Sequence, residues 1–97
     1  MINKKSDLQD LAEKAEFLKI IAHPVRLCIL KGLLEEKKCN VSKMQDCLEI
    51  PQSTISQHLA KLRTAGIITA QRSGVEVYYS IANFKVRNIL TVLFDLI

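Results

Sequence analysis

Apolar residues recur every three or four positions through four consecutive segments of the chain. This spacing predicts amphipathic helices over residues 7–22, 24–36, 42–48 and 52–65. Pro24 ends the first helix, because the residue before a proline resists the α conformation, and it opens the second at a position that needs no backbone donor. Gly66 follows the fourth helix, where a left-handed residue is favoured.

The last third of the chain changes to the pattern of strands. Residues 67–72 and 76–81 predict two strands, and apolar and polar side chains alternate in the second. Ser73 and Gly74 are expected at the tip of the hairpin between them. Asn83 is expected to cap a final helix that continues to the end of the chain.

The predicted order, α-α-α-α-β-β-α, is that of a winged helix-turn-helix domain, which is mainly α with a β-hairpin wing. The third and fourth helices have the lengths and the short connection of the helix-turn-helix. Ser42 and Gln45 form a capping-box pattern that predicts where the third helix begins. No repeat or flexible linker divides residues 1–97, so a single domain is expected.

The outward face of the fourth helix and the hairpin suit contact with double-stranded DNA. With Ile55, Leu59 and Leu62 inward, that helix face is polar or basic and has no acidic residue. Glutamine pairs with adenine edges, serine and threonine with bases or phosphates, and lysine attracts phosphate. A solvated helix face is the alternative, which the neighbouring turn and hairpin disfavour. The expected contacts are Gln52, Ser53, Thr54, Ser56, Gln57, His58, Lys61, Arg72, Ser73 and Gly74.

Composition adds two expectations. The net charge is +4, and the excess of basic residues is larger in residues 51–97 than in residues 1–50, so phosphate is attracted weakly. Hydrophobic residues make up 48%, with a mean hydropathy of +0.12, which is apolar for 97 residues and predicts a subunit interface.

No apolar stretch is long enough to span a membrane, and no secretory signal is visible, so we expect a cytoplasmic protein.

Three stretches together resemble the ArsR/SmtB family of bacterial repressors, nearest to its metal-independent, PagR-like branch: AHPVRL at 22–27, PQSTISQHL at 51–59 and GVEVYYSI at 74–81. The resemblance covers about residues 15–94. It implies repression by a homodimer whose two recognition helices enter successive major grooves of an imperfect palindrome. Pro51 departs from the family pattern, because many members have a Ser-type cap there.

The resemblance also implies that the first and last helices build the homodimer. The residues expected in that interface are Leu8, Leu11, Ala15, Leu90, Leu93 and Ile97.

The metal sites of the family lack their ligands in this sequence. Asn40, Val41 and Ser42 stand where the resemblance places an arsenic-type Cys-Val-Cys. Residues 83–97 contain no histidine, and Asp95 is their only carboxylate side chain, whereas zinc needs about four ligands. We therefore expect no metal at these sites and no other cofactor.

The three cysteines have different expected roles. The dithiol switch of the family needs a cysteine in the last helix, and there is none. Cys28 and Cys47 are expected to be small buried hydrophobic residues. Cys39 follows two lysines, so we expect an exposed thiol with a lowered pKa, and a redox role through an intermolecular disulfide stays open beside an incidental thiol.

An enzyme is not expected. His23 and His58 are far apart in the predicted order and neither has an acidic partner; His23 suits a helix-junction cap and His58 a half-buried position. The sequence also leaves two other functions open. One is a winged-helix module that binds a protein partner, and the other is an activator or anti-silencer that uses the same groove contacts.

Overall fold

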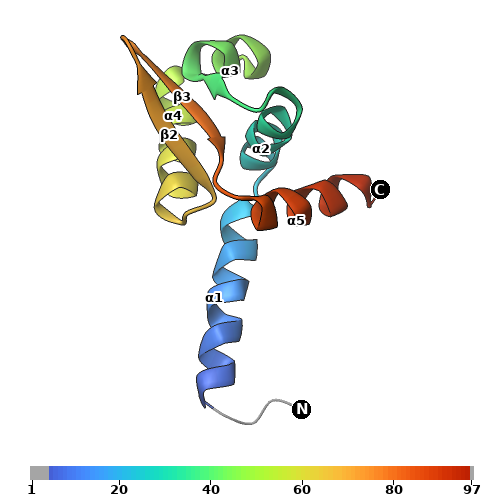
Figure 1. Cartoon of the computed structure of the whole chain (residues 1–97). Coiled ribbons are helices and arrows are strands. Elements are labelled where there is room, and N and C mark those ends of the chain that lie inside the picture. Colours follow the sequence, from blue (N-terminus) through green and yellow to red (C-terminus); the bar gives the residue numbers. More distant parts are fainter. Residues whose placement is uncertain (1–4, 97) are drawn as a thin grey trace.

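The computed structural model describes residues 5–96, and the predicted order of elements is confirmed with one addition (Figure 1). The described part of the chain forms five helices and three strands: α1 (Lys5–Ile21), α2 (Pro24–Glu36), β1 (Cys39–Asn40), α3 (Val41–Leu48), α4 (Gln52–Thr64), β2 (Ile68–Ser73), β3 (Glu76–Ile81) and α5 (Phe84–Asp95). The wing hairpin stands at one end of the molecule, and α1 projects from the other.

The added element is β1, which turns the expected hairpin into a three-stranded antiparallel sheet of order β1-β3-β2. Cys39 pairs with Tyr79 and Asn40 with Tyr78. The Asn40 side chain also donates a 2.6 Å hydrogen bond to the Glu76 carboxylate. The wing is therefore joined directly to the beginning of α3.

Side chains cap the starts of α2, α3 and α5, the last through Asn83 as expected. The ring Nδ1 of His23 accepts from the Val25 amide at 3.1 Å, so His23 caps α2 as expected. The expected start of α3 is wrong, because Asn40, not Ser42, caps it: the Lys43 amide donates to Asn40 Oδ1 at 2.9 Å. Asn40 is extended at the end of β1, so Ser42 already lies inside the helix.

Two glycines occupy positions that need a positive φ. Gly66 has φ +76° after α4, as predicted. Gly74 has φ +64° and, with Val75, forms a two-residue loop between the paired residues Ser73 and Glu76. The hairpin tip therefore lies one residue later than expected.

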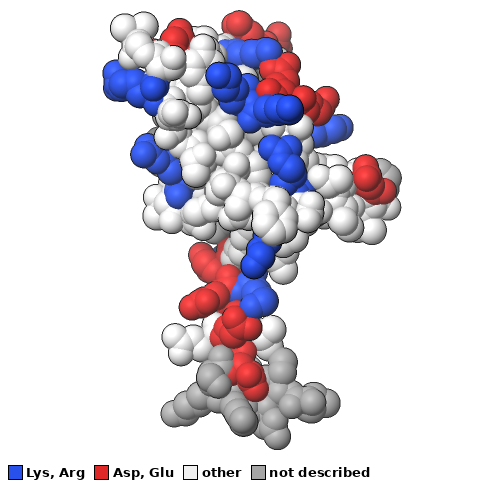
Figure 2. All heavy atoms as spheres, viewed as in Figure 1, with Lys and Arg blue, Asp and Glu red and all other residues white. Residues whose placement is uncertain are grey.

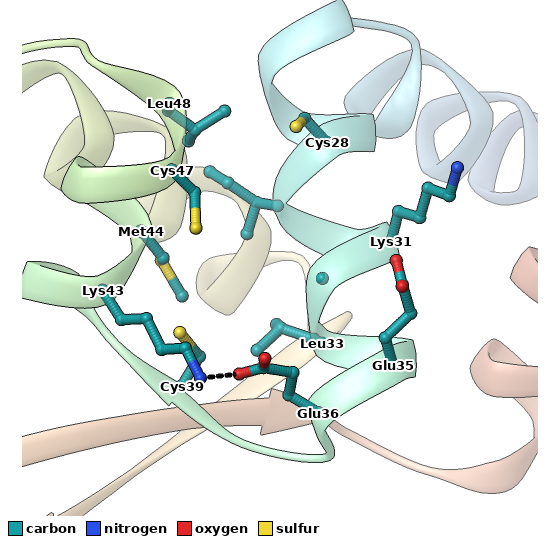
Figure 3. Close-up of a pocket in the computed structure, with 12 residues that line it drawn as sticks. Cys28, Lys31, Leu33, Glu35, Glu36, Cys39, Lys43, Met44, Cys47 and Leu48 are labelled. Atoms are coloured by element: carbon teal, nitrogen blue, oxygen red, sulfur yellow. Dashed lines mark ion pairs between the residues drawn. The ribbon is translucent and has the colours of Figure 1, made fainter.

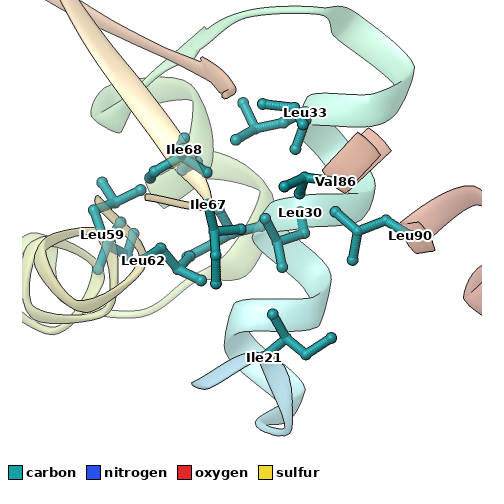
Figure 4. Close-up of a cluster of buried hydrophobic side chains, with 13 residues drawn as sticks. Ile21, Leu30, Leu33, Leu59, Leu62, Ile67, Ile68, Val86 and Leu90 are labelled. Carbon is teal, nitrogen blue, oxygen red and sulfur yellow. The ribbon is translucent and has the colours of Figure 1, made fainter. Parts of the chain in front are cut away.

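The hydrophobic core forms around α2, where side chains from α4, β2 and α5 converge (Figure 4). Leu30 and Leu33 of α2 are completely buried. Leu90 of α5 is also completely buried, so its assignment to a dimer interface is wrong: it packs inside the protomer. The core residues are Ile21, Ile29, Leu30, Leu33, Met44, Ile55, Leu59, Leu62, Ile67, Ile68, Ile81, Val86 and Leu90.

A buried arginine connects three helices. Arg26 of α2 donates from Nη1 to the backbone oxygen of Ile20 in α1 at 2.8 Å. Its Nε donates to Nδ1 of His58 in α4 at 3.1 Å. The His58 ring lies 4.5 Å, centroid to centroid, from the ring of His23. The sequence order suggested that these histidines are far apart, and the fold brings them into contact.

His58 must be neutral to accept this hydrogen bond. Burial lowers its pKa below the ordinary value, and the nearby His23, Arg26 and Lys61 lower it further. The described neighbours of this ring include no carboxylate that would favour its protonation. Protonated His58 would instead place its positive charge beside the Arg26 guanidinium.

This geometry predicts that acid weakens the fold through His58. Because the folded-state pKa is lowered, the unfolded chain binds more protons, so stability falls as the pH drops through the ordinary histidine pKa toward the folded value. The His58→Gln variant keeps an acceptor for Arg26 but does not titrate. Its free energy of unfolding should fall less than that of the wild type between about pH 7.5 and pH 5.5, measured by urea denaturation. Equal pH dependence in both proteins would contradict this role.

Candidate nucleic-acid interface

The helix-turn-helix consists of α3 and α4, joined by residues 49–51. Glu49 takes the left-handed conformation, with φ 57°, and its amide closes α3 on the Gln45 carbonyl at 2.8 Å. Pro51 precedes α4, and no described side chain caps that helix start. The departure from a Ser-type cap therefore leaves backbone N–H groups of the first turn available to a phosphate oxygen.

The two faces of α4 have the expected character. Ile55, Leu59 and Leu62 are buried in the core. On the opposite face, Ser53, Gln57 and Lys61 follow one another at four-residue spacing, and all three are exposed. We call these three residues the α4 ridge.

The other expected contacts on α4 lie beside this ridge. Gln52 and Ser56 are exposed, and Thr54 is half-buried. His58 is half-buried with Nδ1 occupied by Arg26, so only the rest of its ring can face a ligand. Arg26 is a positioning residue that the sequence analysis missed; the pattern itself contains no signal that joins it to His58, 32 positions away.

The wing presents its expected contacts to solvent. Arg72, Ser73 and Gly74 are all exposed at the end of the β2–β3 hairpin. Val75 beside them is 94% exposed, which makes the tip partly apolar. At the side of the wing, the Lys38 ammonium lies 5.0 Å from the centre of the Tyr78 ring, a cation–π contact.

Charge is distributed unevenly over the molecule. Figure 2 shows acidic side chains along the projecting α1 and a second group at the upper right, over α2 and α3, whereas Lys and Arg predominate on the side of the hairpin and α4. The acidic residues of α1 are Asp7, Asp10, Glu13 and Glu16. The α4 sequence has no acidic residue and carries Lys61 and Arg63 in its last turn. Phosphate is therefore attracted to the side of the molecule that carries the α4 ridge and the wing.

A second surface consists of apolar side chains on α1 and α5, which we call the α1–α5 apolar face. Leu8 is 60% exposed and Leu93 37%. A groove lined by Glu13, Lys14, Phe17 and Leu18 of α1 and by Ile89 of α5 lies between the two helices. The exposed large residues of this face are Leu8, Leu11, Leu18, Ile89, Val92, Leu93 and Leu96.

Several of the expected interface residues belong to this face. Leu8, Leu11, Ala15 and Leu93 are exposed, and Ile97 lies outside the described residues. The sequence analysis missed Leu18, Ile89, Val92 and Leu96. The sequence of α5 does contain a signal for them, because apolar residues occur all around this helix. Burial against a single protomer requires apolar residues on only one face.

The expectations for the three cysteines are corrected. Cys28 and Cys47 are exposed, not buried, because their helices turn other residues toward the core. Cys39 is only half-buried, yet burial raises the pKa of its thiol more than Lys43 lowers it. The raised pKa leaves less thiolate, which weakens the argument for a redox role of Cys39.

Neither a metal centre nor a membrane span is found in the part of the chain that the structure describes. No group of three or more His, Cys, Asp or Glu side chains there could hold a metal ion. None of the described helices is long and apolar enough to cross a membrane.

The comparisons with known proteins agree with this geometry. The model of the family described as "Bacterial regulatory protein, arsR family" matches residues 23–70. The transcriptional repressor PagR of Bacillus anthracis is 42% identical over 92 residues, which are 95% of this chain and 92% of PagR.

Solved structures extend the similarity to the fold. The crystal structure of PagR of Bacillus anthracis superposes with a TM-score of 0.79 at 44% identity, covering 89% of this chain and 98% of PagR. That of NolR from Sinorhizobium fredii gives a TM-score of 0.86 at 30% identity, covering 99% of this chain and 95% of NolR. The expected resemblance is confirmed, and the chain belongs to the arsR family of bacterial regulatory proteins, which makes it a DNA-binding transcriptional regulator and not an enzyme.

Proposed function

We propose that this protein is a cytoplasmic repressor that binds an imperfect palindrome in double-stranded DNA as a homodimer and blocks access to a promoter. The observation that carries the proposal is the α4 ridge, an exposed polar and basic row on a helix whose other face is buried. The major groove of B-DNA admits an α-helix with such a face. The similarity to the repressor PagR over nearly its whole length supports repression over activation.

The contacts on α4 divide into base reading and phosphate binding. Gln57, at the middle of the ridge, suits a bidentate contact with an adenine edge. Ser53 and Thr54 suit bases or phosphates near the helix start, where the uncapped N–H groups add phosphate contacts. Lys61 suits the phosphate backbone. The flanking contacts are Gln52, Ser56 and the free part of the His58 ring.

The wing supplies a second point of attachment. Arg72 is exposed near the hairpin tip and suits a phosphate or the minor groove, with Ser73 and Gly74 beside it. The Asn40–Glu76 hydrogen bond ties this wing, close to its tip, to the beginning of α3. Wing and helix-turn-helix can therefore bind the duplex as one rigid unit.

The α1–α5 apolar face supports the homodimer. Leu8, Leu11, Ala15 and Leu93 would pack against the second copy, together with Ile97 at the end of the chain. So many large apolar side chains in solvent are costly for a chain of 97 residues, and a second copy would cover them. A twofold dimer reads a palindrome, because each protomer presents the same α4 ridge. No metal is proposed, since the ligands of the family's sites are replaced.

The first test is a selection of bound sequences from random duplexes. The proposal predicts an inverted repeat whose half-sites lie about 10 base pairs apart, centre to centre, as expected for two recognition helices in successive major grooves. Sequencing the bound fraction after several rounds gives the answer. Enrichment of a single unrepeated half-site, or of nothing, would contradict dimeric palindrome binding.

Substitutions on the ridge should separate base reading from phosphate attraction. On the selected duplex, Gln57→Ala should cost about 1–3 kcal/mol while affinity for random DNA changes little. Lys61→Ala should weaken both complexes and lower the slope of log affinity against log salt by about one. Fluorescence anisotropy at several salt concentrations measures both effects.

The matched control for Lys61 is Lys31→Ala, an exposed lysine of α2 that belongs to neither the α4 ridge, the wing nor the α1–α5 apolar face. Its DNA affinity and salt slope should match the wild type. If Gln57→Ala and Lys61→Ala bind like this control, α4 is not the DNA-reading helix.

A charge in the α1–α5 apolar face should break the dimer. Leu93→Asp places an unpaired carboxylate among apolar side chains, so it should sediment as a monomer and bind the selected duplex weakly. Leu93→Met, which roughly conserves volume, should stay dimeric. Analytical ultracentrifugation distinguishes monomers from dimers, and a fully dimeric Leu93→Asp protein would overturn this interface.

A further inference from the structure

A pocket lies between α2 and α3 (Figure 3), and none of its lining residues belongs to the α4 ridge. We call it the α2–α3 pocket. Its volume is about 340 Å³, which lies within the range of small-molecule sites. Ile29 and Leu33 of α2 form one wall, and Met44 and Leu48 of α3 form the other.

Sulfur atoms are concentrated around this pocket. The thiols of Cys28, Cys39 and Cys47 and the thioether of Met44 all line it, from α2, β1 and α3. In Figure 3, Cys39, Met44 and Cys47 point into the space between the two helices. Sulfur is polarisable and makes favourable contacts with aromatic rings, worth about 0.3–1.5 kcal/mol each.

The charges at the pocket compensate one another. Lys43 of α3 and Glu36 of α2 form an ion pair across its opening (Figure 3). Burial keeps the Cys39 thiol protonated, since it raises the pKa. These features favour an uncharged occupant, and the described residues offer no cluster that could hold a metal ion.

Gly32 is an independent indication that the pocket is kept open. It lies inside α2, where glycine costs about 1 kcal/mol relative to alanine, and it is not one of the glycines with positive φ. A Cβ atom at Gly32 would meet no atom within 4 Å. Neither backbone conformation nor crowding therefore requires glycine here. What the missing side chain does provide is space, because Gly32 lines the pocket.

We propose that the α2–α3 pocket is a binding site for a small, uncharged aromatic molecule of one or two rings. This inference goes beyond DNA binding and does not depend on it. The occupant would stack on the sulfur-rich wall of α3 and fill the space beside Gly32. Because α3 packs against α4, the site lies one helix away from the α4 ridge.

The test titrates the full chain with 6-propionyl-2-(dimethylamino)naphthalene, an uncharged two-ring dye whose emission moves to shorter wavelength in apolar surroundings. The wild type should bind it saturably. Gly32→Leu fills the pocket and should weaken binding about tenfold or more. Gly32→Ala, the matched control, adds a single methyl group and should retain binding. Circular dichroism melting of all three proteins checks that they fold.

Methyl NMR of the wild type locates the dye, and this measurement does not depend on how Gly32→Leu folds. The Met44 and Leu33 methyl signals should shift with the same saturation curve as the fluorescence. The proposal is overturned if wild type and folded Gly32→Leu bind the dye equally. It is also overturned if the Met44 signal stays unchanged at saturation while Leu93, on the α1–α5 apolar face, shifts.

Discussion

The burial of one face of α4 is the constraint on which the rest of the structure depends. Ile55, Leu59 and Leu62 enter a core built around α2, and this packing determines how α4 is rotated about its axis. Since a helix advances about 100° per residue, fixing those three side chains also fixes the α4 ridge on the solvent side. Replacing any of them with alanine would cost about 2–5 kcal/mol, so the orientation is strongly held.

Arg26 extends this constraint to the rest of the molecule. It is only 9% exposed and, among the described residues, its hydrogen bonds go to two neutral acceptors, the Ile20 carbonyl and His58. One guanidinium thus links the end of α1, which carries part of the α1–α5 apolar face, to α4. In a dimer, the position of each α4 ridge would follow from the packing of α1 through this link.

Periodicity predicted the helices and the wing, because every long element buries one face and its apolar spacing reveals that face. The features that periodicity did not predict are either very short or join residues that are far apart in the sequence. β1 has two residues, too few to show alternation, and the sequence pattern therefore predicts Ser42 at the start of α3, where the structure has Asn40 as the cap. The exposure of Cys28 and the burial of Leu90 depend on how each helix is rotated, which spacing alone resolves poorly when most positions are apolar. The His23–His58 contact joins residues that are 35 positions apart, so no local pattern in the sequence indicates it.

In the proposed dimer, the two α4 ridges stand one helical turn of DNA apart. Pulsed electron–electron double resonance measures the distance between the two protomers directly. The spin label is attached at Ser56→Cys, beside the ridge, in a variant without Cys28, Cys39 and Cys47. On the selected duplex, we expect one inter-protomer distance centred at about 34 Å, the spacing of successive major grooves. No inter-protomer distance, or one far longer than a helical turn, would contradict it.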